Sequence, residues 1–301
     1  MIPMKAYGFT RYGGAENEAF LDLPVPEPGP DEILVRVAAA GVNPADWKVR
    51  AGLRRADLPL EPPVALGREV AGTVERLGSG VSGFAVGDEV FGGTVGSAGG
   101  WAEFARVPAA FAAPRPAAVT VTDAAVLPVA AATAYDAVVQ LALPPGARLL
   151  VVGAGGGVGL AAVQLARTRG VEVVGIASRG KHELLAGLGA TPLAPGADVP
   201  GAVEAVLDLV GGDALRGAVA GLDGNPRPIL SAADHTGVAV LGGHPVERVR
   251  SGDRLAAVAR LVAEGALDPH VTEVRPFDEA GSALAVVEGG HARGKIVLRI
   301  T

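Results

Sequence analysis

A glycine-rich run at residues 153–159, with the sequence GAGGGVG, is the segment of this chain best suited to chemistry. It follows a continuous apolar stretch at residues 148–152, which predicts a buried strand, and it precedes residues 158–169, which predict a helix. Glycine lets a backbone turn tightly and approach a pyrophosphate closely, and the unpaired N–H groups of a helix N-terminus attract phosphate charge. The run therefore predicts a dinucleotide site.

The spacing of this run is not the usual G-x-G-x-x-G, because Val158 stands where the last glycine would fall. It fits Gly153-x-x-Gly156-x-x-Gly159 instead, and the strand before it and the helix after it carry the prediction. The alternative is a glycine-rich loop that binds no ligand. The residues of the run that are predicted to bind the cofactor are Gly153, Gly155, Gly156, Gly157, Val158 and Gly159.

The end of the next predicted strand, residues 171–177, decides between the two nicotinamide cofactors. NAD sites usually carry Asp or Glu there to bind the ribose 2′-hydroxyl. Here the strand runs into Ser178, Arg179 and Lys181 without a carboxylate. A hydroxyl and two cations suit a 2′-phosphate, which Arg can bind with two parallel hydrogen bonds. These three residues therefore predict NADPH, and the alternative is a solvated basic turn.

Further cofactor contacts are expected where later strands end, because ligands bind at the carboxyl edge of an open parallel sheet. A third strand is predicted at residues 205–210, and later strands are expected to end near residues 231 and 241–243. The predicted contacts at these ends are Val210, Ser231, Leu241, Gly242 and Gly243.

The two parts of the chain differ in their pattern of elements. Short strands at 33–37, 69–74, 88–91 and 101–107, separated by Gly and Pro turns, predict a barrel-like module. Residues 123–141 are helical in character despite Pro128, and strands and helices alternate after them, which predicts a parallel sheet covered by helices. A helix at 254–264 and a strand at 294–300 close the chain, and that strand resembles the first part. The predicted fold class is α/β.

Composition excludes several classes of function. The 301 residues are 49% hydrophobic with a net charge of −6, so nothing favours a nucleic acid or an anionic membrane as partner. The absence of cysteine rules out disulfides, thiol nucleophiles and cysteine-bound zinc. The start of the chain lacks the apolar run of a signal peptide, and no stretch is long and apolar enough for a membrane span. These features predict a cytoplasmic protein.

Several motifs in order resemble those of one family. They are AGVNPADWKVR at 40–50, LGREVAGTV at 66–74, GDEVFG at 87–92, GWAEF at 100–104, the glycine turn, and ARGKIVL at 292–298. The chain resembles the medium-chain dehydrogenase/reductase superfamily, specifically its zinc-independent quinone oxidoreductase branch, which is similar to enoyl reductase domains. The resemblance implies a GroES-like catalytic domain at 1–122, a Rossmann NADPH-binding domain at 123–265 and a return to the catalytic domain at 266–301. It also implies a homodimer through the edge of the Rossmann domain.

The chain departs from the zinc-dependent relatives at the metal ligands. Those relatives carry Cys where Gly41-Val42-Asn43 stands and His-Glu where Arg68-Glu69 stands, so no metal is expected. Without a Lewis acid, hydride addition to a quinone or an α,β-unsaturated carbonyl is the easier reaction, and catalysis depends mostly on positioning. The alternative is a non-catalytic NADPH-binding protein with a structural or regulatory role. Arg68 either faces an anionic group of the substrate or pairs with Glu69.

The resemblance also implies roles for five polar residues. Asn43 either donates to the substrate carbonyl or orders the ribose, and the alternative is a turn residue before Pro44. Lys48 is a weaker catalytic candidate, because a solvated or structural pair with Asp46 is the competing interpretation. Tyr135 has a titratable hydroxyl without a firm role. The remaining two, Thr133 and Lys295, are expected beside the cofactor, with a plain helix residue and a surface charge as the respective alternatives.

Overall fold

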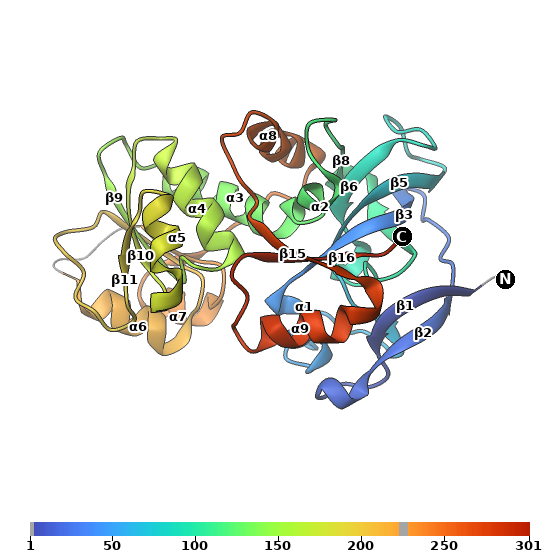
Figure 1. Ribbon diagram of the computed structural model, residues 1–301, viewed down its shortest axis with the longest axis horizontal. Helices are drawn as coiled ribbons and strands as arrows, with labels where there is room; N and C mark the ends of the chain where they lie inside the picture. The colour runs from blue at the N-terminus through green and yellow to red at the C-terminus, as the bar shows by residue number, and fades with distance from the viewer. Residues whose placement is uncertain (1–2, 223–227) are drawn as a thin grey trace. The chain divides into compact units, whose positions relative to one another are not determined.

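The computed structural model describes residues 3–222 and 228–301, which separate into two units (Figure 1). Unit 1 comprises Met1–Val129, Arg250–Ala263 and Val271–Thr301, and unit 2 comprises Ala130–Val249 and Glu264–His270. Helix α8 (Gly252–Ala263) falls within the Rossmann domain expected at 123–265, but here it packs on strand β8 (Ala112–Pro114) of unit 1. The approach is close, since a Cβ at Gly252 would lie 2.5 Å from the Ala112 carbonyl oxygen.

Unit 1 contains a three-stranded sheet, β2-β1-β4, and a seven-stranded sheet in the order β15-β16-β3-β5-β6-β8, with β7 also paired to β3. The closing strand β16 runs antiparallel to β3, with Ile296 opposite Val42. This pairing brings the C-terminal segment to the end of β3. The strands are β1 (Pro3–Phe9), β2 (Glu18–Pro24), β3 (Glu32–Val42), β4 (Val64–Ala65), β5 (Glu69–Leu77), β6 (Glu89–Gly93), β7 (Phe104–Pro108), β8 (Ala112–Pro114), β15 (Val271–Pro276) and β16 (Lys295–Arg299). The helices are α1 (Pro44–Arg50), α2 (Val121–Ala124), α8 (Gly252–Ala263) and α9 (Ala280–Glu288).

Unit 2 is built on a parallel six-stranded sheet in the order β11-β10-β9-β12-β13-β14. The chain moves outward from β9 through β10 to β11 and then returns to β12 on the other side of β9. The strand order therefore reverses between β9 and β12, which is where such sheets bind ligands. The strands are β9 (Arg148–Val152), β10 (Glu172–Ile176), β11 (Thr191–Leu193), β12 (Ala205–Asp208), β13 (Ile229–Ser231) and β14 (His244–Pro245). The helices are α3 (Ala132–Leu141), α4 (Gly157–Arg167), α5 (His182–Gly187), α6 (Gly212–Ala220) and α7 (His235–Val240).

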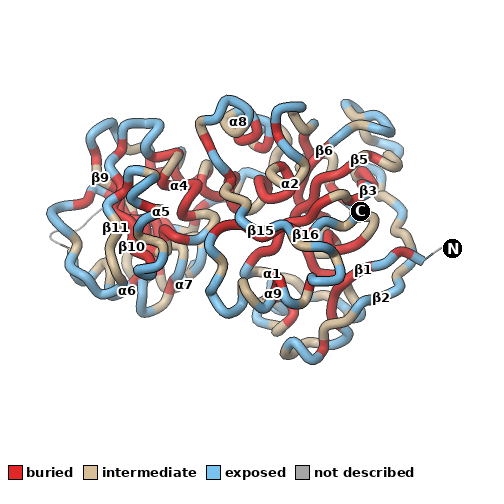
Figure 2. Tube along the Cα trace, in the orientation of Figure 1, coloured by how far each residue is buried: buried red, intermediate tan, exposed pale blue. Residues whose placement is uncertain are grey.

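Helices cover both faces of this parallel sheet. Leu150 and Val206 on one face pack in a cluster with Leu215 of α6 and Val238 of α7. Gly175 faces the opposite way, because a Cβ there would lie 3.4 Å from Leu185 of α5. The strands are consequently apolar on both sides, and buried residues follow them in Figure 2. The predicted α/β class, with a parallel-sheet unit and a separate β-rich unit, is confirmed.

Two expected elements differ in the structure. The helix expected at 123–141 is split into α2, a π-helical turn at Leu127–Ala131, and α3. Pro128 accounts for the break, since proline lacks the N–H that a regular helix needs and its ring crowds the preceding turn. The strand expected at 205–210 ends at Asp208, whose carboxylate accepts the N–H groups of Val210 and Gly211 and turns the chain.

A buried charged group joins three elements of unit 1. Arg50, at the end of α1, is 2% exposed and pairs with Glu18 of β2 and, at 2.7 Å, with Glu288 of α9. Its Nε also donates to the Gly13 carbonyl oxygen, and Tyr7 donates to the second oxygen of Glu18 at 2.8 Å. This network ties the β2 edge of the smaller sheet to both helices.

Arg50→Met should destabilise the protein by about 3–5 kcal/mol, because it leaves the buried Glu18 carboxylate without a cation. The control is Arg36→Met, which removes a pair with Glu75 whose side chains are 53% and 37% exposed and should cost about 1 kcal/mol or less. Urea unfolding of both variants measures the difference. Equal losses for the two would contradict the structural role of Arg50.

Candidate functional site

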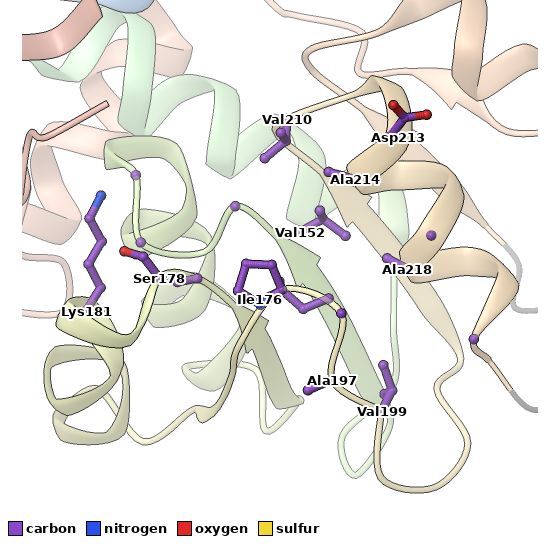
Figure 3. A pocket seen from close by; sticks show the side chains of 18 of the residues that line it. Val152, Ile176, Ser178, Lys181, Ala197, Val199, Val210, Asp213, Ala214 and Ala218 are labelled. Carbon is purple, nitrogen blue, oxygen red and sulfur yellow. The ribbon is translucent and has the colours of Figure 1, made fainter. Parts of the chain in front are cut away.

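A cavity of about 440 Å³ opens in unit 2 where β9 and β10 end (Figure 3). The glycine turn forms one side of it, and Ser178 and Lys181 lie at the end of β10. Val210, which follows β12, lies on the opposite side in Figure 3. The complete lining is Val152, Gly153, Gly155, Gly156, Ile176, Ala177, Ser178, Lys181, Pro195, Gly196, Ala197, Asp198, Val199, Val210, Asp213, Ala214, Gly217, Ala218 and Gly221.

Glycine is required at three positions of the turn because neighbouring atoms leave no room for a Cβ. Gly153 has a φ of +87°, and a Cβ there would lie 2.7 Å from Cγ2 of Val210. A Cβ at Gly155 would lie 2.3 Å from Cδ of Lys181. A Cβ at Gly159 would lie 2.5 Å from the Ala154 carbonyl oxygen, so this glycine lets α4 pack on its own turn.

The turn is suited to hold a pyrophosphate. The N–H groups of Gly153 and Ala154 both donate to the Ile176 carbonyl oxygen at 3.0 Å, which fixes the turn against β10. Gly156 directly precedes α4, and the first N–H groups of a helix have no carbonyl partner within it. A bare backbone surface and a helix N-terminus at one end of a cavity fit the phosphates of a dinucleotide.

Two of the three residues predicted to select NADPH line the cavity. Lys181 lies with its aliphatic stem across Gly155, and burial lowers the pKa of its ammonium group. Ser178 is on the same edge, whereas Arg179 is exposed in the turn between them and is not among the lining residues. The turn continues into α5, where a ring nitrogen of His182 lies 2.9 Å from the Ala177 carbonyl oxygen.

The sequence analysis missed the wall of the cavity that lies away from the glycine turn. One face of α6 contributes Ala214, Gly217 and Ala218, whose small side chains leave room for a flat ring system. The segment 195–199, which follows β11, also lines the cavity and includes Asp198. The Pro195-Gly196 turn signal could have indicated that a further strand, now seen as β11, ends just before it.

Ser231 ends β13, as predicted, but its hydroxyl is committed to the protein. It is fully buried, donates to Asp208 at 2.6 Å and accepts the N–H groups of Ala233 and Asp234. Asp208 thus joins the ends of β12 and β13. The Asp234 carboxylate accepts the N–H groups of Gly212 and Gly237, and these bonds lower its pKa.

The prediction that Leu241, Gly242 and Gly243 end a strand is wrong. They follow helix α7 and precede β14, so they lie at the amino edge of the sheet. The apolar run before them belongs to α7, and short apolar runs do not distinguish helix from strand. Leu241, Gly242 and Gly243 therefore lie away from the carboxyl edge of the sheet, where the cofactor contacts were expected.

Unit 1 holds a second polar cluster, and it is almost completely buried. Lys295, at the start of β16, donates to the Val42 carbonyl oxygen at 3.1 Å, to Oδ1 of Asn43 at 2.6 Å and to Oε1 of Glu69 at 3.0 Å. Asn43 in turn donates from Nδ2 to the same Glu69 oxygen at 2.8 Å. The other Glu69 oxygen accepts the Val129 N–H at 2.7 Å. Lys295 is therefore a buried member of a network and not a surface charge.

Asp46 lies against this network and is 1% exposed. Its Oδ2 accepts the Asn43 N–H at 2.8 Å, whereas its Oδ1 has no hydrogen-bond partner among the described residues. Burial raises the pKa of Asp46 to about 7, although Arg68, the Asn43 N–H and Lys295 oppose the rise. The alternative of a solvated pair between Asp46 and Lys48 is therefore wrong, because Asp46 is buried and its charged neighbours are Arg68, Glu69 and Lys295.

The other predicted residues have the following places. Lys48 is half-buried on α1, with its Nζ 5.7 Å from the ring centroid of Trp47. Thr133 is buried and Tyr135 is half-buried on α3. Gly157 and Val158 start α4, and neither lines the cavity. Asn43, Lys48 and Lys295 belong to unit 1, and the other predicted site residues belong to unit 2.

Two general features of the described residues bear on function. No described helix has the length and apolar character needed to cross a membrane. Within residues 3–222 and 228–301, no three His, Asp or Glu side chains are grouped so that they could hold a metal ion.

Two family models match segments of the chain. Residues 29–117 match the alcohol dehydrogenase GroES-like domain, and residues 190–298 match the zinc-binding dehydrogenase domain. A 2-methylene-furan-3-one reductase of Solanum lycopersicum is 32% identical over 98% of this chain and 79% of its own.

The fold is also similar to those of solved structures. The quinone oxidoreductase from Coxiella burnetii superimposes with a TM-score of 0.92 at 28% identity, over 99% of this chain and 100% of that one. A mycobacterial protein whose structure is complexed with NADPH superimposes with a TM-score of 0.84 at 27% identity, over 98% and 99% of the two chains.

The buried Asp46 predicts a pH-dependent stability. Its pKa of about 7 in the folded state exceeds the ordinary value of 3.8, so the folded state binds the proton more tightly than the unfolded state. The free energy of unfolding should therefore fall as the pH rises from about 4 to about 7. Asp46→Asn should remove this decrease and be the more stable protein at pH 8, by at most about 4 kcal/mol.

Chemical unfolding between pH 4 and pH 8 measures this effect, with Asp22→Asn, an exposed change on β2, as the control. A parallel pH dependence for Asp46→Asn and the unaltered protein would rule out the assignment.

Proposed function

Because the chain belongs to the medium-chain dehydrogenase/reductase superfamily, among its quinone oxidoreductase-like members, we propose that it is an NADPH-dependent reductase of quinones or α,β-unsaturated carbonyl compounds. The observation that carries the proposal is the cavity of unit 2, which combines the glycine turn with Ser178 and Lys181 and has no acidic residue at the end of β10.

Different residues of the cavity would bind different parts of the cofactor. The turn from Gly153 to Gly156 and the start of α4 would hold the pyrophosphate. The small residues of α6 would border the adenine, and Ser178 and Lys181 would bind the 2′-phosphate. Asp213, which also lines the cavity, accepts a hydrogen bond from Arg216 at 2.6 Å, and this pair offsets part of its charge.

NADPH supplies the hydride when it is bound, and the residues of the chain must orient and polarise the acceptor. Asn43 is the strongest candidate, because Glu69 and Lys295 fix its side chain and its amide carries a second N–H that would donate to a carbonyl oxygen. Tyr135 and Lys48 remain weaker candidates for the same task, and Thr133 and Lys295 remain candidates for contact with the cofactor.

Two further parts of the proposal concern the state of the protein. β14 is a two-residue edge strand of the parallel sheet, and we propose that a homodimer forms through this edge. We also propose that the protein works in the cytoplasm on a small-molecule substrate.

NADPH oxidation, followed at 340 nm with a panel of quinones and enones, tests the activity. We expect turnover with at least one electron-poor acceptor and little with simple aldehydes. Tight NADPH binding without turnover of any acceptor would instead favour a structural or regulatory protein.

Lys181→Met tests the choice of cofactor, because methionine keeps an aliphatic stem over Gly155 and removes the charge. Loss of a charge-assisted hydrogen bond should raise the KM for NADPH about 10- to 100-fold and leave the KM for NADH nearly unchanged. Arg179→Met is the matched control and should have the smaller effect, since Arg179 is exposed outside the cavity lining. Equal losses for NADPH and NADH would exclude a 2′-phosphate site at Lys181.

A further inference from the structure

Arg68 directly precedes β5, and its side chain is the unusual feature of unit 1. Its backbone is held by the Thr94 N–H, which donates to the Arg68 carbonyl oxygen at 3.0 Å. The side chain is half-buried, and its Nε is inaccessible to solvent yet has no hydrogen-bond partner among the described residues. Buried guanidinium groups in folded proteins are normally paired with an acid or with several acceptors.

The charges around Arg68 do not neutralise it. Asp46 attracts it most strongly, but this carboxyl is itself deeply buried and half-protonated near neutral pH. Glu69 is the smallest of these influences on the Arg68 pKa, and its oxygens accept from Lys295, Asn43 and Val129 and not from Arg68.

Two further arginines act on Arg68 with the same sign of charge. Arg54 and Arg250 both disfavour its charged form, and together with burial they lower its pKa. Arg54 has a partner in Asp57, at 3.4 Å, in the turn that follows α1, whereas Arg250 is exposed just before α8. Arg68, with its buried and unpartnered Nε, and the two like-charged arginines that act on it are together called the Arg68 cluster.

The half-buried Arg68 guanidinium is costly to the fold unless it binds an anion, because its Nε lacks an acceptor. Moving an unpaired charge out of water lowers the stability of a protein by several kcal/mol. A guanidinium group keeps its charge at physiological pH, so it cannot avoid this penalty by losing a proton. Replacing Arg68 by an apolar residue of similar length should relieve this cost. Its presence is explained if the cluster is completed by a negatively charged ligand.

We propose that the Arg68 cluster binds the carboxylate of the substrate, so that the preferred acceptors are unsaturated keto acids or quinones that carry a carboxylate. This inference rests on the proposed function and deepens it. The planar fork of one arginine matches a carboxylate with two parallel hydrogen bonds. The nearby Asp46 and Glu69 favour a singly charged group over a phosphate dianion, because each adds repulsion to a more highly charged ligand.

Matched substrates test the proposal. The probes are trans-4-oxo-2-pentenoate and its methyl ester, which share the enone and differ by one charge. The unaltered protein should prefer the acid. Arg68→Met should lower kcat/KM for the acid about 10- to 100-fold and change that for the ester less than threefold. Arg106→Met also removes one charge from unit 1, on β7, and should change neither.

A binding measurement separates this inference from the proposed function. The saturated acid 4-oxopentanoate and its methyl ester are titrated calorimetrically into the protein with NADP⁺ present. Preferential binding of the acid that Arg68→Met abolishes supports the cluster, even if no acceptor is turned over. Equal loss of binding for the acid and the ester, or no loss for either, overturns the inference. It is also overturned if Arg68→Met raises only the KM for NADPH, because the anion bound by Arg68 would then be the cofactor.

Thermal stability provides a further readout that a structural arginine would not give. Arg68→Met should leave the melting temperature unchanged or raise it, because it removes an uncompensated charge. Arg68→Lys, which keeps the charge but loses the fork, should retain part of the preference for the acid. A large drop in melting temperature for Arg68→Met, together with retained preference for the acid, would show that Arg68 serves the fold.

Discussion

The buried ion pair between Lys295 and Glu69 is the interaction on which the chemistry of unit 1 depends. Lys295 is 5% exposed and Glu69 is fully buried, so removing either partner would leave the other charge buried and unpaired. Every donor of the Lys295 ammonium group and both oxygens of Glu69 have partners. The pair fastens the final strand to the ends of β3 and β5, and it fixes the side chain of Asn43.

The same network explains why its neighbours are charged in unusual ways. The hydrogen bonds of Glu69 go to Lys295, Asn43 and Val129, so Arg68 gains no hydrogen bond from it. Asp46 accepts the backbone N–H of Asn43 in a buried site, and this burial raises its pKa to about 7. Arg68, whose Nε has no acceptor among the described residues, and Asp46, whose pKa is about 7, therefore lie beside the Lys295–Glu69 pair, whose hydrogen bonds are complete.

The cavity of unit 2 follows a different principle, because its polar groups belong mainly to the backbone. Glycines at positions 153, 155 and 159 remove side chains where β9, β10 and α4 approach each other. The charged side chain of Lys181 crosses the turn at Gly155. A site of this kind binds phosphate through geometry, and one or two side chains at its edge are left to distinguish the cofactors.

The sequence by itself determined the features that depend on adjacent residues. The strand, glycine turn and helix at 148–169, and the cationic turn after β10, need only local periodicity and residue type. Tertiary structure decided the rest, because pairing and burial join residues that are far apart in the chain, as Lys295 and Glu69 are by 226 positions. No local pattern marks Asp46 as buried, Arg68 as unpartnered or the small residues of α6 as a cavity wall. The run before residue 241 was misread for the same reason, since only its packing distinguishes a short helix from a strand.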